Sequence, residues 1–170
     1  MNEPHLLNTC RKLLSFDEST GLFNWIVSRG TKKAGDLAGG LTHDGYWTIR
    51  INRKHYAAHR LAYLMTYGYL PQFIDHINND RADNRVANLR EASKSENCRN
   101  RKSHKGSSSK FKGVFWHKSD KRWRASIYIH GKLRYLGQYM SEIDAAKAYD
   151  QVAIKEFGKF AKTNKDMGLL

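Results

Sequence analysis

The chain contains few cysteines and no long apolar segment. Its two cysteines, Cys10 and Cys98, are too few for a disulfide framework or a four-cysteine zinc site. Such usage is typical of the reducing cytoplasm, where disulfides seldom form. No apolar run approaches the roughly 18 residues of a membrane-spanning helix, and the N-terminal residues lack the layout of a secretory signal peptide. We therefore expect a soluble cytoplasmic protein.

Acidic residues are also scarce. The 170 residues include 30 lysines and arginines but only 16 aspartates and glutamates, which gives a formal net charge of +14 and an isoelectric point near 9.9. Sixteen basic and ten acidic residues precede Ser103, and fourteen and six follow it, so each half is basic. This balance indicates a polyanionic partner. A membrane surface also attracts basic residues, but the sequence contains no long basic amphipathic helix.

A polar stretch in the middle of the chain carries the densest set of candidate catalytic side chains. Asp75 and His76 end a short apolar run, and a loop rich in Asn, Asp and Arg follows. Asn88-Leu89-Arg90 comes next, and then a segment that contains Asn97. Ser93 begins a capping-box pattern, which predicts a helix start there. The predicted order of strand, loop, strand and helix lets a carboxylate, an imidazole and an amide converge on one metal ion.

These residues, in this order, resemble the His-Asn-His (HNH) endonuclease motif, in the homing-endonuclease branch whose third signature residue is asparagine. The resemblance implies a β-β-α metal finger in which Asp75 and Asn97 bind a divalent metal, Mg²⁺ or Mn²⁺. It also implies that His76 is the general base that activates water, and that Asn88 braces the loop so that His76 points correctly. The chemistry agrees, because Mg²⁺ prefers oxygen ligands and takes only one or two carboxylates from a protein. Taken singly, these residues also fit ordinary turn, surface and helix positions; their order favours the site.

The segment upstream also fits this resemblance, which extends over residues 16–102. The helices and strands expected before the motif cover residues 1–15, 22–27, 46–51, 54–57 and 59–67. His59 lies either beside the metal site or in the core, and the core is the more common place for a histidine at a helix start. The basic loop 28–40 either contacts phosphates or is an ordinary solvated loop.

Residues 103–110 have the composition of a flexible linker, with Gly106 and three serines between lysines. Three basic residues, Arg99, Arg101 and Lys102, come just before it. A basic tether alongside DNA and a solvated tether both fit this composition. The domains with expected DNA roles on either side favour the tether alongside DNA.

The sequence after the linker alternates with the period of a strand whose two faces differ. One face is apolar and carries Trp123, Ala125, Ile127 and Ile129. The other face is basic and polar and carries Arg122, Arg124, Ser126, Tyr128 and His130. Strands are expected at 112–117 and 133–139 on either side of this one. A helix is expected from Ser141, which fits an N-cap, to Phe157, before Gly158.

This C-terminal segment resembles the plant ethylene-response-factor type of DNA-binding domain over residues 111–162. The matching motifs are Phe111-Lys112-Gly113-Val114, Trp123, Leu136-Gly137 and Ala145-Ala146-Lys147-Ala148-Tyr149-Asp150. The resemblance implies a three-stranded antiparallel sheet laid in the DNA major groove, with a helix behind it. Phe115 stands where the family usually has an arginine, and Ser126 and Tyr128 replace a charged pair. The base preference of the plant domain therefore cannot be carried over.

Two short segments and one sheet face are expected to contact DNA. The expected contact residues are Lys112, His117, Arg122, Arg124, Ser126, Tyr128, Arg134, Tyr135, Arg99, Arg101 and Lys102. The hairpin register leaves two of them open. A two-residue turn at His130-Gly131 puts Arg134 on the apolar face and Tyr135 on the DNA face, and a three-residue turn reverses both.

Together these patterns predict a two-domain α+β protein. The expected boundaries are a nuclease domain at 1–102, a linker at 103–110, a sheet-plus-helix DNA-binding domain at 111–162 and a tail at 163–170. The expected function is a metal-dependent endonuclease that cuts double-stranded DNA as a monomer in the cytoplasm of a bacterial host cell, similar to bacteriophage or intron-encoded homing endonucleases. The alternatives are a sequence-specific DNA-binding regulator with an inactive nuclease domain and an RNA-binding or structural protein.

Overall fold

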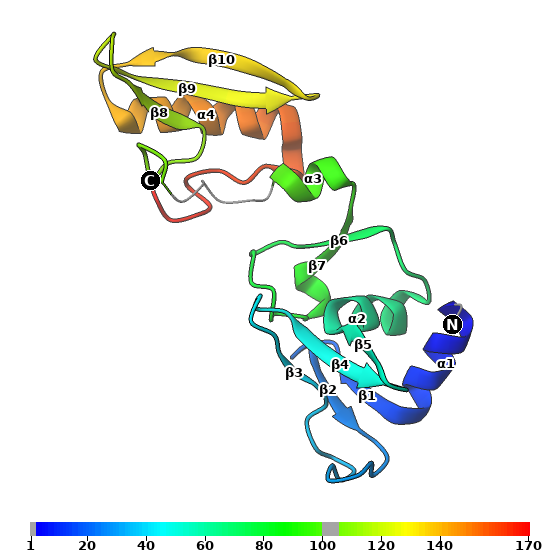
Figure 1. Cartoon of the computed structure of the whole chain (residues 1–170). Coiled ribbons are helices and arrows are strands. Elements are labelled where there is room, and N and C mark those ends of the chain that lie inside the picture. The colour runs from blue at the N-terminus through cyan, green and yellow to red at the C-terminus, as the bar shows by residue number, and fades with distance from the viewer. Residues whose placement is uncertain (1–2, 100–105) are drawn as a thin grey trace. The chain divides into compact units, whose positions relative to one another are not determined.

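A computed structural model describes residues 3–99 and 106–170, with only the backbone of Cys98 and Arg99. The chain divides into two compact units, Met1–Lys94 and Ser95–Leu170 (Figure 1). Helices and small antiparallel sheets occur in the chain, so the expected α+β class is confirmed. In the described ranges, no helix is long and apolar enough to cross a membrane.

The first unit combines two helices with three small sheets. Helix α1 (Glu3–Leu13) packs against helix α2 (Ala58–Tyr67), and the sheets have the strand orders β1-β2, β3-β4-β5 and β6-β7. The strand bounds are β1 Leu14–Asp17, β2 Leu22–Trp25, β3 Gly40–Leu41, β4 Trp47–Ile51, β5 Lys54–Ala57, β6 Phe73–His76 and β7 Leu89–Ala92. A 3-10 helix, η1 (Val86–Asn88), precedes β7, and helix α3 (Lys94–Arg99) begins directly after Ser93. Strand β1 was not expected; it follows α1 without a gap and pairs with β2.

The core of the first unit lies between α1, α2 and the central sheet. Its most deeply buried side chains are Cys10, Phe23, Ile49, Ile51, Leu61 and Leu64. Burial raises the pKa of the Cys10 thiol to about 11, so it stays protonated and acts as a small apolar group. The β4–β5 hairpin turns at Asn52 and Arg53, whose φ angles are 48° and 66°. Two positive φ angles are the mark of a type I′ turn, which matches the twist of paired strands.

The second unit is a three-stranded antiparallel sheet with one face covered by a helix (Figure 1). Its elements are β8 Val114–His117, β9 Arg122–Ile129, β10 Lys132–Tyr139, α4 Glu142–Phe157 and η2 Gly158–Phe160, and the strand order is β10-β9-β8. Helix α4 starts where Ser141 Oγ accepts a hydrogen bond from the Asp144 amide at 3.4 Å. Ala145, Ala146 and Ala153 are fully buried. Small side chains at these positions let the helix lie close to the sheet.

The β9–β10 hairpin has a two-residue turn. Lys132 is the partner of Ile129, and His130 and Gly131 both have positive φ angles. Arg134 therefore sits opposite Ile127 on the α4 side, where its guanidinium pairs with Glu156 at 3.2 Å. Of the two registers left open by the sequence, this one keeps Arg134 off the predicted DNA face.

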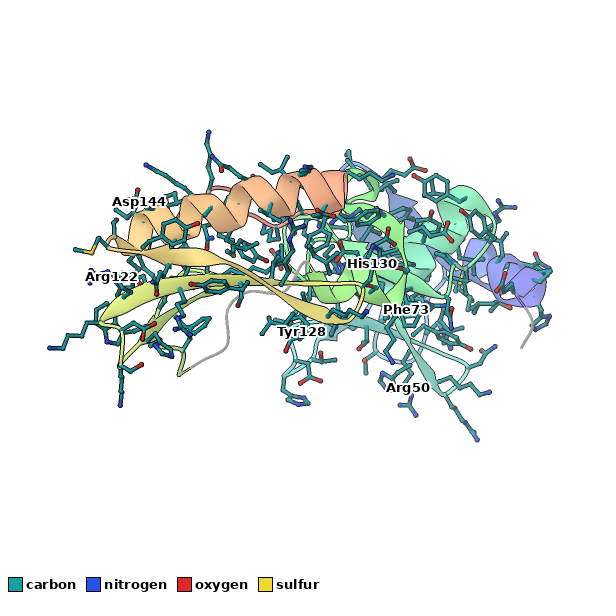
Figure 2. All side chains as sticks on the ribbon, turned by 90° about the horizontal axis from the view of Figure 1, so that it is seen from above. Arg50, Phe73, Arg122, Tyr128, His130 and Asp144 are labelled. Carbon is teal, nitrogen blue, oxygen red and sulfur yellow. The ribbon has the colours of Figure 1, made fainter. Side chains whose placement is uncertain are left out.

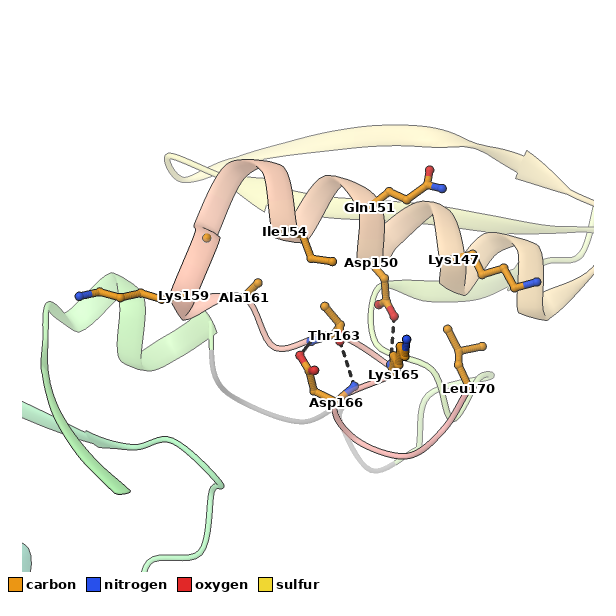
Figure 3. A pocket seen from close by; sticks show the side chains of 11 residues that line it. Lys147, Asp150, Gln151, Ile154, Lys159, Ala161, Thr163, Lys165, Asp166 and Leu170 are labelled. Carbon is orange, nitrogen blue, oxygen red and sulfur yellow. Dashed lines mark hydrogen bonds between the residues drawn. The ribbon is translucent and has the colours of Figure 1, made fainter. Parts of the chain in front are cut away.

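The last residues of the chain pack into the second unit. Asn164 is fully buried, and its Oδ1 accepts a hydrogen bond from the Lys112 amide at 2.7 Å. Its own amide nitrogen and Nδ2 both donate to Asp150 Oδ1 on α4, at 2.7 and 2.8 Å. The Lys165 amide donates to the other oxygen of Asp150 (Figure 3). Residues 163–170, expected to be a tail, thus belong to the folded unit because a buried amide and carboxylate tie them to α4.

A pair of glycines with the same backbone conformation tests how tightly α4 packs. Gly113 and Gly131 have φ angles of 75° and 76°, but a Cβ at Gly113 would lie 2.0 Å from the Tyr149 ring, and one at Gly131 would meet nothing within 4 Å. Gly131→Ala should cost only the backbone strain, about 1–2 kcal/mol. Gly113→Ala should cost a further ~1–3 kcal/mol from overpacking. Urea unfolding of the two variants measures the difference, and equal losses would contradict this packing.

Candidate active site and nucleic-acid interface

Two adjacent side chains of strand β6, Asp75 and His76, are buried, with 3% and 6% of their surface exposed. The antiparallel pairing of β6 with β7 places Arg90 directly opposite Asp75. Arg90 Nε and Nη2 both donate to Asp75 Oδ2, at 2.8 and 2.7 Å. A buried carboxylate is stable only when its charge is compensated. The Arg90 guanidinium supplies that compensation for Asp75 inside the unit.

The loop between β6 and β7 is closed by the side chain of Asn88. Asn88 Oδ1 accepts a hydrogen bond from the Asn78 amide at 3.0 Å, and Nδ2 donates to the Asp83 carbonyl at 2.8 Å. The Asn88 carbonyl accepts from the Ile77 amide at 2.9 Å. One residue thus ties both ends of the loop that follows His76. This is the geometry that a loop-bracing role requires.

Two aromatic residues from other elements lie beside His76. The ring of His59, near the start of α2, meets the His76 ring edge-on with centroids 4.9 Å apart. The Tyr46 ring lies 5.6 Å from His59 and 6.2 Å from His76, and the Arg81 guanidinium covers Tyr46 at 4.9 Å. His59 therefore starts a helix and also reaches the candidate site. The sequence offered no local signal for Tyr46, which lies thirty positions before His76.

Burial keeps the two histidines in their neutral form. It lowers the pKa of His59 to about 3, and the nearby His76 and Arg60 add to the shift. Burial also lowers the pKa of His76, although Asn84 and Asp75 act in the opposite direction. A neutral imidazole can accept a proton, so His76 is in the protonation state that a general base needs.

Asn84 is a candidate site residue that the sequence did not single out. It is 3% exposed, and its Nδ2 donates to the Ala82 carbonyl at 2.9 Å. Its Oδ1 is buried without a hydrogen-bond partner among the described residues, and the Asn84 side chain raises the pKa of His76 against the effect of burial. The only signal in the sequence was its place in the polar loop after His76.

The oxygen donors of the motif suit a hard cation. Asp75 offers a carboxylate, and Asn97, half-buried on α3 in the second unit, offers an amide oxygen. No group of three or more His, Cys, Asp or Glu side chains within 3–99 and 106–170 could hold a metal ion. Carboxylate and amide oxygens are the kinds of ligand that Mg²⁺ prefers.

The open face of the second unit's sheet, away from α4, is basic and aromatic. Strand pairing places Phe115 and His117 of β8 and Leu133, Tyr135 and Gln138 of β10 on the same face as Arg122, Arg124, Ser126 and Tyr128 of β9. Tyr128 and Tyr135 are 66% and 55% exposed, and Figure 2 shows Tyr128 on the side away from the helix. Arg124 pairs with Asp120, and its guanidinium lies 5.8 Å from the Tyr135 ring. These contacts hold Arg124 in place on the face.

Two residues that were predicted to contact DNA, Lys112 and Arg134, lie away from the open sheet face. Lys112 points toward the C-terminal segment, where its Nζ donates to the Lys162 carbonyl at 3.4 Å, and burial lowers its pKa to about 8. Arg134 lies on the α4 side, as described above. His117 stays on the open face beside Asp120, with 3.3 Å between Nδ1 and the carboxylate. Arg101, Lys102 and the side chain of Arg99 fall outside the described residues.

Comparisons with known proteins reveal two separate similarities. Residues 56–99 match the family model described as HNH endonuclease. An HNH endonuclease of Acanthamoeba polyphaga mimivirus, described as uncharacterized, is 34% identical over 110 residues, which is 63% of this chain and 56% of the viral protein. Residues 56–99 therefore match the HNH endonuclease domain that the motif predicted.

The second similarity is to plant proteins. APETALA2-like protein 2 of Oryza sativa subsp. indica is 46% identical over 59 residues, which is 34% of this chain and 13% of the rice protein. Ethylene-responsive transcription factor WRI1 of Arabidopsis thaliana is 43% identical over 61 residues, or 35% and 14%. The three-stranded sheet with one helix is consistent with this type of domain. The chain spans just over half of the viral relative and a small part of the plant ones.

The Asn88 brace can be tested by stability. Asn88→Ala removes one acceptor and one donor from part-buried backbone groups, so it should lower the free energy of unfolding by about 1–3 kcal/mol. Asn8→Ala, at an exposed position on α1, is the control and should cost less than ~1 kcal/mol. Urea unfolding measures both. The brace has no support if Asn88→Ala unfolds at the same midpoint as the wild type.

Proposed function

We propose that this protein is a metal-dependent DNA endonuclease, whose first unit hydrolyses phosphodiester bonds and whose second unit grips the duplex. The observation that carries the proposal is that Asp75 and His76, at consecutive positions of β6, are both buried, with the carboxylate paired to Arg90 and the imidazole neutral. A carboxylate suits a divalent cation, and a neutral imidazole suits proton transfer from water. The HNH endonuclease match over residues 56–99 supports the same chemistry.

His76 acts as the general base. Its neutral imidazole takes a proton from the water that attacks phosphorus, and the bond from phosphorus to the leaving oxygen breaks. A positioned base of this kind contributes roughly 10²–10⁴-fold to the rate. Because burial lowers the pKa of His76, the ring is ready to accept the proton near neutral pH.

Asp75 and Asn97 would hold the divalent cation, Mg²⁺ or Mn²⁺. When bound, such a cation stabilises the negative charge that develops on the phosphate in the transition state. Arg90 contributes by holding the Asp75 carboxylate in place through two hydrogen bonds to one oxygen. One such site acts on one strand, so a monomer would nick the duplex.

Three neighbours position the base. Asn88 fixes the loop after His76 through its bonds to Asn78 and Asp83. The Asn84 side chain raises the pKa of His76 and so favours proton uptake by the ring. His59 packs edge-on against the ring and limits its rotation. These three residues act on His76 itself and need no contact with the substrate.

The open sheet face of the second unit lies against DNA. A sheet of this width can enter the major groove, where arginine pairs with guanine and tyrosine or serine makes further contacts. Arg124, Ser126 and Tyr128 project from the middle strand on that face. The similarity to plant transcription-factor domains supports this placement. Residues such as Phe115 set a base preference of their own.

A plasmid assay tests the nuclease. His76→Ala should lower the nicking rate at least tenfold in Mg²⁺, given the usual worth of a general base, while DNA affinity stays within twofold. His55→Ala, an exposed histidine on β5, is the control and should cut like the wild type. Adding EDTA should stop nicking by both cutting proteins. Tight DNA binding without nicking in either metal would instead identify a DNA-binding regulator, and a preference for RNA would identify an RNA-binding protein.

A second experiment tests the DNA face. Arg124→Ala should weaken binding to the preferred duplex by about 1–3 kcal/mol and relax one base position, if this arginine reads a guanine edge. Lys155→Ala, on the exposed side of α4, removes the same charge and should have little effect. Fluorescence anisotropy on specific and random duplexes compares them. Equal losses for the two variants would remove the open face from the DNA interface.

A further inference from the structure

A second basic site lies on the first unit. All of its lining residues precede the segment that matches the HNH endonuclease family, which begins at residue 56. The site is a pocket of about 460 Å³ lined by Trp25, Arg29, Lys32, Arg50 and Arg53. Three pieces of chain build it: the end of β2, the turn that follows, and the β4–β5 hairpin. Arg50, labelled in Figure 2, is exposed on β4. None of the five lining residues belongs to the candidate active site.

The floor of the pocket is an arginine stacked on a buried tryptophan. The Arg29 guanidinium lies 4.8 Å from the centre of the Trp25 ring, and Trp25 is only 7% exposed. Arg29 and Lys32 face each other across a tight turn closed by two backbone hydrogen bonds of 2.8 and 3.0 Å. The Nη1 atom of Arg29 is buried and has no hydrogen-bond partner among the described residues. The stacked Arg29 thus has a donor that the described residues leave without a partner, on a guanidinium that lines the pocket.

The charges of the pocket are uncompensated. Four of its five lining residues are cations and none is acidic, and within the described part of the chain none of the four forms an ion pair. Other arginines of the protein do pair with carboxylates, as Arg90 does with Asp75. Like charges gathered without a counter-charge repel one another, and an anion placed among them relieves that repulsion.

Arg53 is held in an unfavourable backbone conformation. It has a φ angle of 66° at the second position of a type I′ turn, where glycine is favoured. An arginine there costs stability, and its side chain lines the pocket. A strained position that carries a long cationic side chain suggests a binding role for that side chain.

We infer that this pocket binds phosphate groups of the DNA backbone. Guanidinium groups match phosphate oxygens through paired N–H donors. The Trp25 ring is buried under Arg29, so it offers no surface for a base to stack on, and the lining side chains offer no carboxylate or amide to read one. A contact with backbone phosphates carries no sequence information and positions the duplex for the first unit. The inference rests on the proposed function in one respect, that duplex DNA is the ligand.

The test compares two charge-matched double variants of the full chain, with duplex DNA in EDTA. Arg50→Gln with Arg53→Gly removes two pocket cations, and glycine suits the turn, so the melting temperature should not fall. Arg11→Gln with Lys12→Gln removes two exposed cations from α1 and is the control. Each lost phosphate contact lowers the slope of log K against log salt by about 0.9. The pocket variant should therefore lose about 1.8 in slope, and the control should keep the wild-type slope.

Two further arms separate the outcomes. An unchanged slope in the pocket variant, or an equal loss in the control, overturns the inference. Binding of inorganic phosphate, measured at constant ionic strength, distinguishes a second source of the ligand. If the pocket variant abolishes saturable phosphate binding but keeps the wild-type DNA slope, the pocket serves free phosphate and the inference is overturned. Nicking in Mg²⁺ is measured separately on the same proteins. A wild type that fails to nick but shows the slope difference refutes the nuclease and supports the pocket.

Discussion

An ionised carboxylate enclosed in the first unit is the constraint on which the candidate active site depends. Removing such a charge from water costs several kcal/mol, and Arg90, directly across the strand pair, offsets that cost with two N–H donors on one oxygen of Asp75. Strands β6 and β7 have only four residues each, so this pair also fixes their register. A slip of one residue would turn every side chain to the other face. The inward position of His76, opposite Leu89, follows from the same register.

Once that register is set, the surroundings of His76 have little freedom. The loop that leaves the strand is tied at both ends by Asn88, so its start cannot drift away from its end. The wall opposite comes from the start of α2 through His59. Burial keeps the imidazoles of His59 and His76 uncharged. The buried carboxylate of Asp75 is compensated by the guanidinium of Arg90. A proton acceptor and an anion therefore coexist at adjacent positions without neutralising each other.

Sequence could predict the features that follow from local pattern. The order of Asp75, His76 and Asn88 predicted the HNH endonuclease domain, and strict alternation along β9 predicted which side chains share a face. It could not predict contacts that depend on long-range packing, such as His59 against His76. Turn geometry decided the face of Arg134, and two turn lengths fitted the sequence equally well. The role of Asn164 was hidden because a polar residue near a chain end usually signals a solvated tail, whereas here it bonds a buried carboxylate.

Alternation along β9 assigns packing and exposure to successive residues. Ala125 and Ile127 are buried against α4, while Ser126 and Tyr128 project from the opposite side of the same strand. A substitution on the open side leaves every packed atom in place, and a substitution on the packed side leaves the outer surface chemically unchanged. Selection for stability and selection for a ligand thus act on different positions. Such a domain can acquire a new target preference by changing alternate residues of one strand, without passing through unstable intermediates.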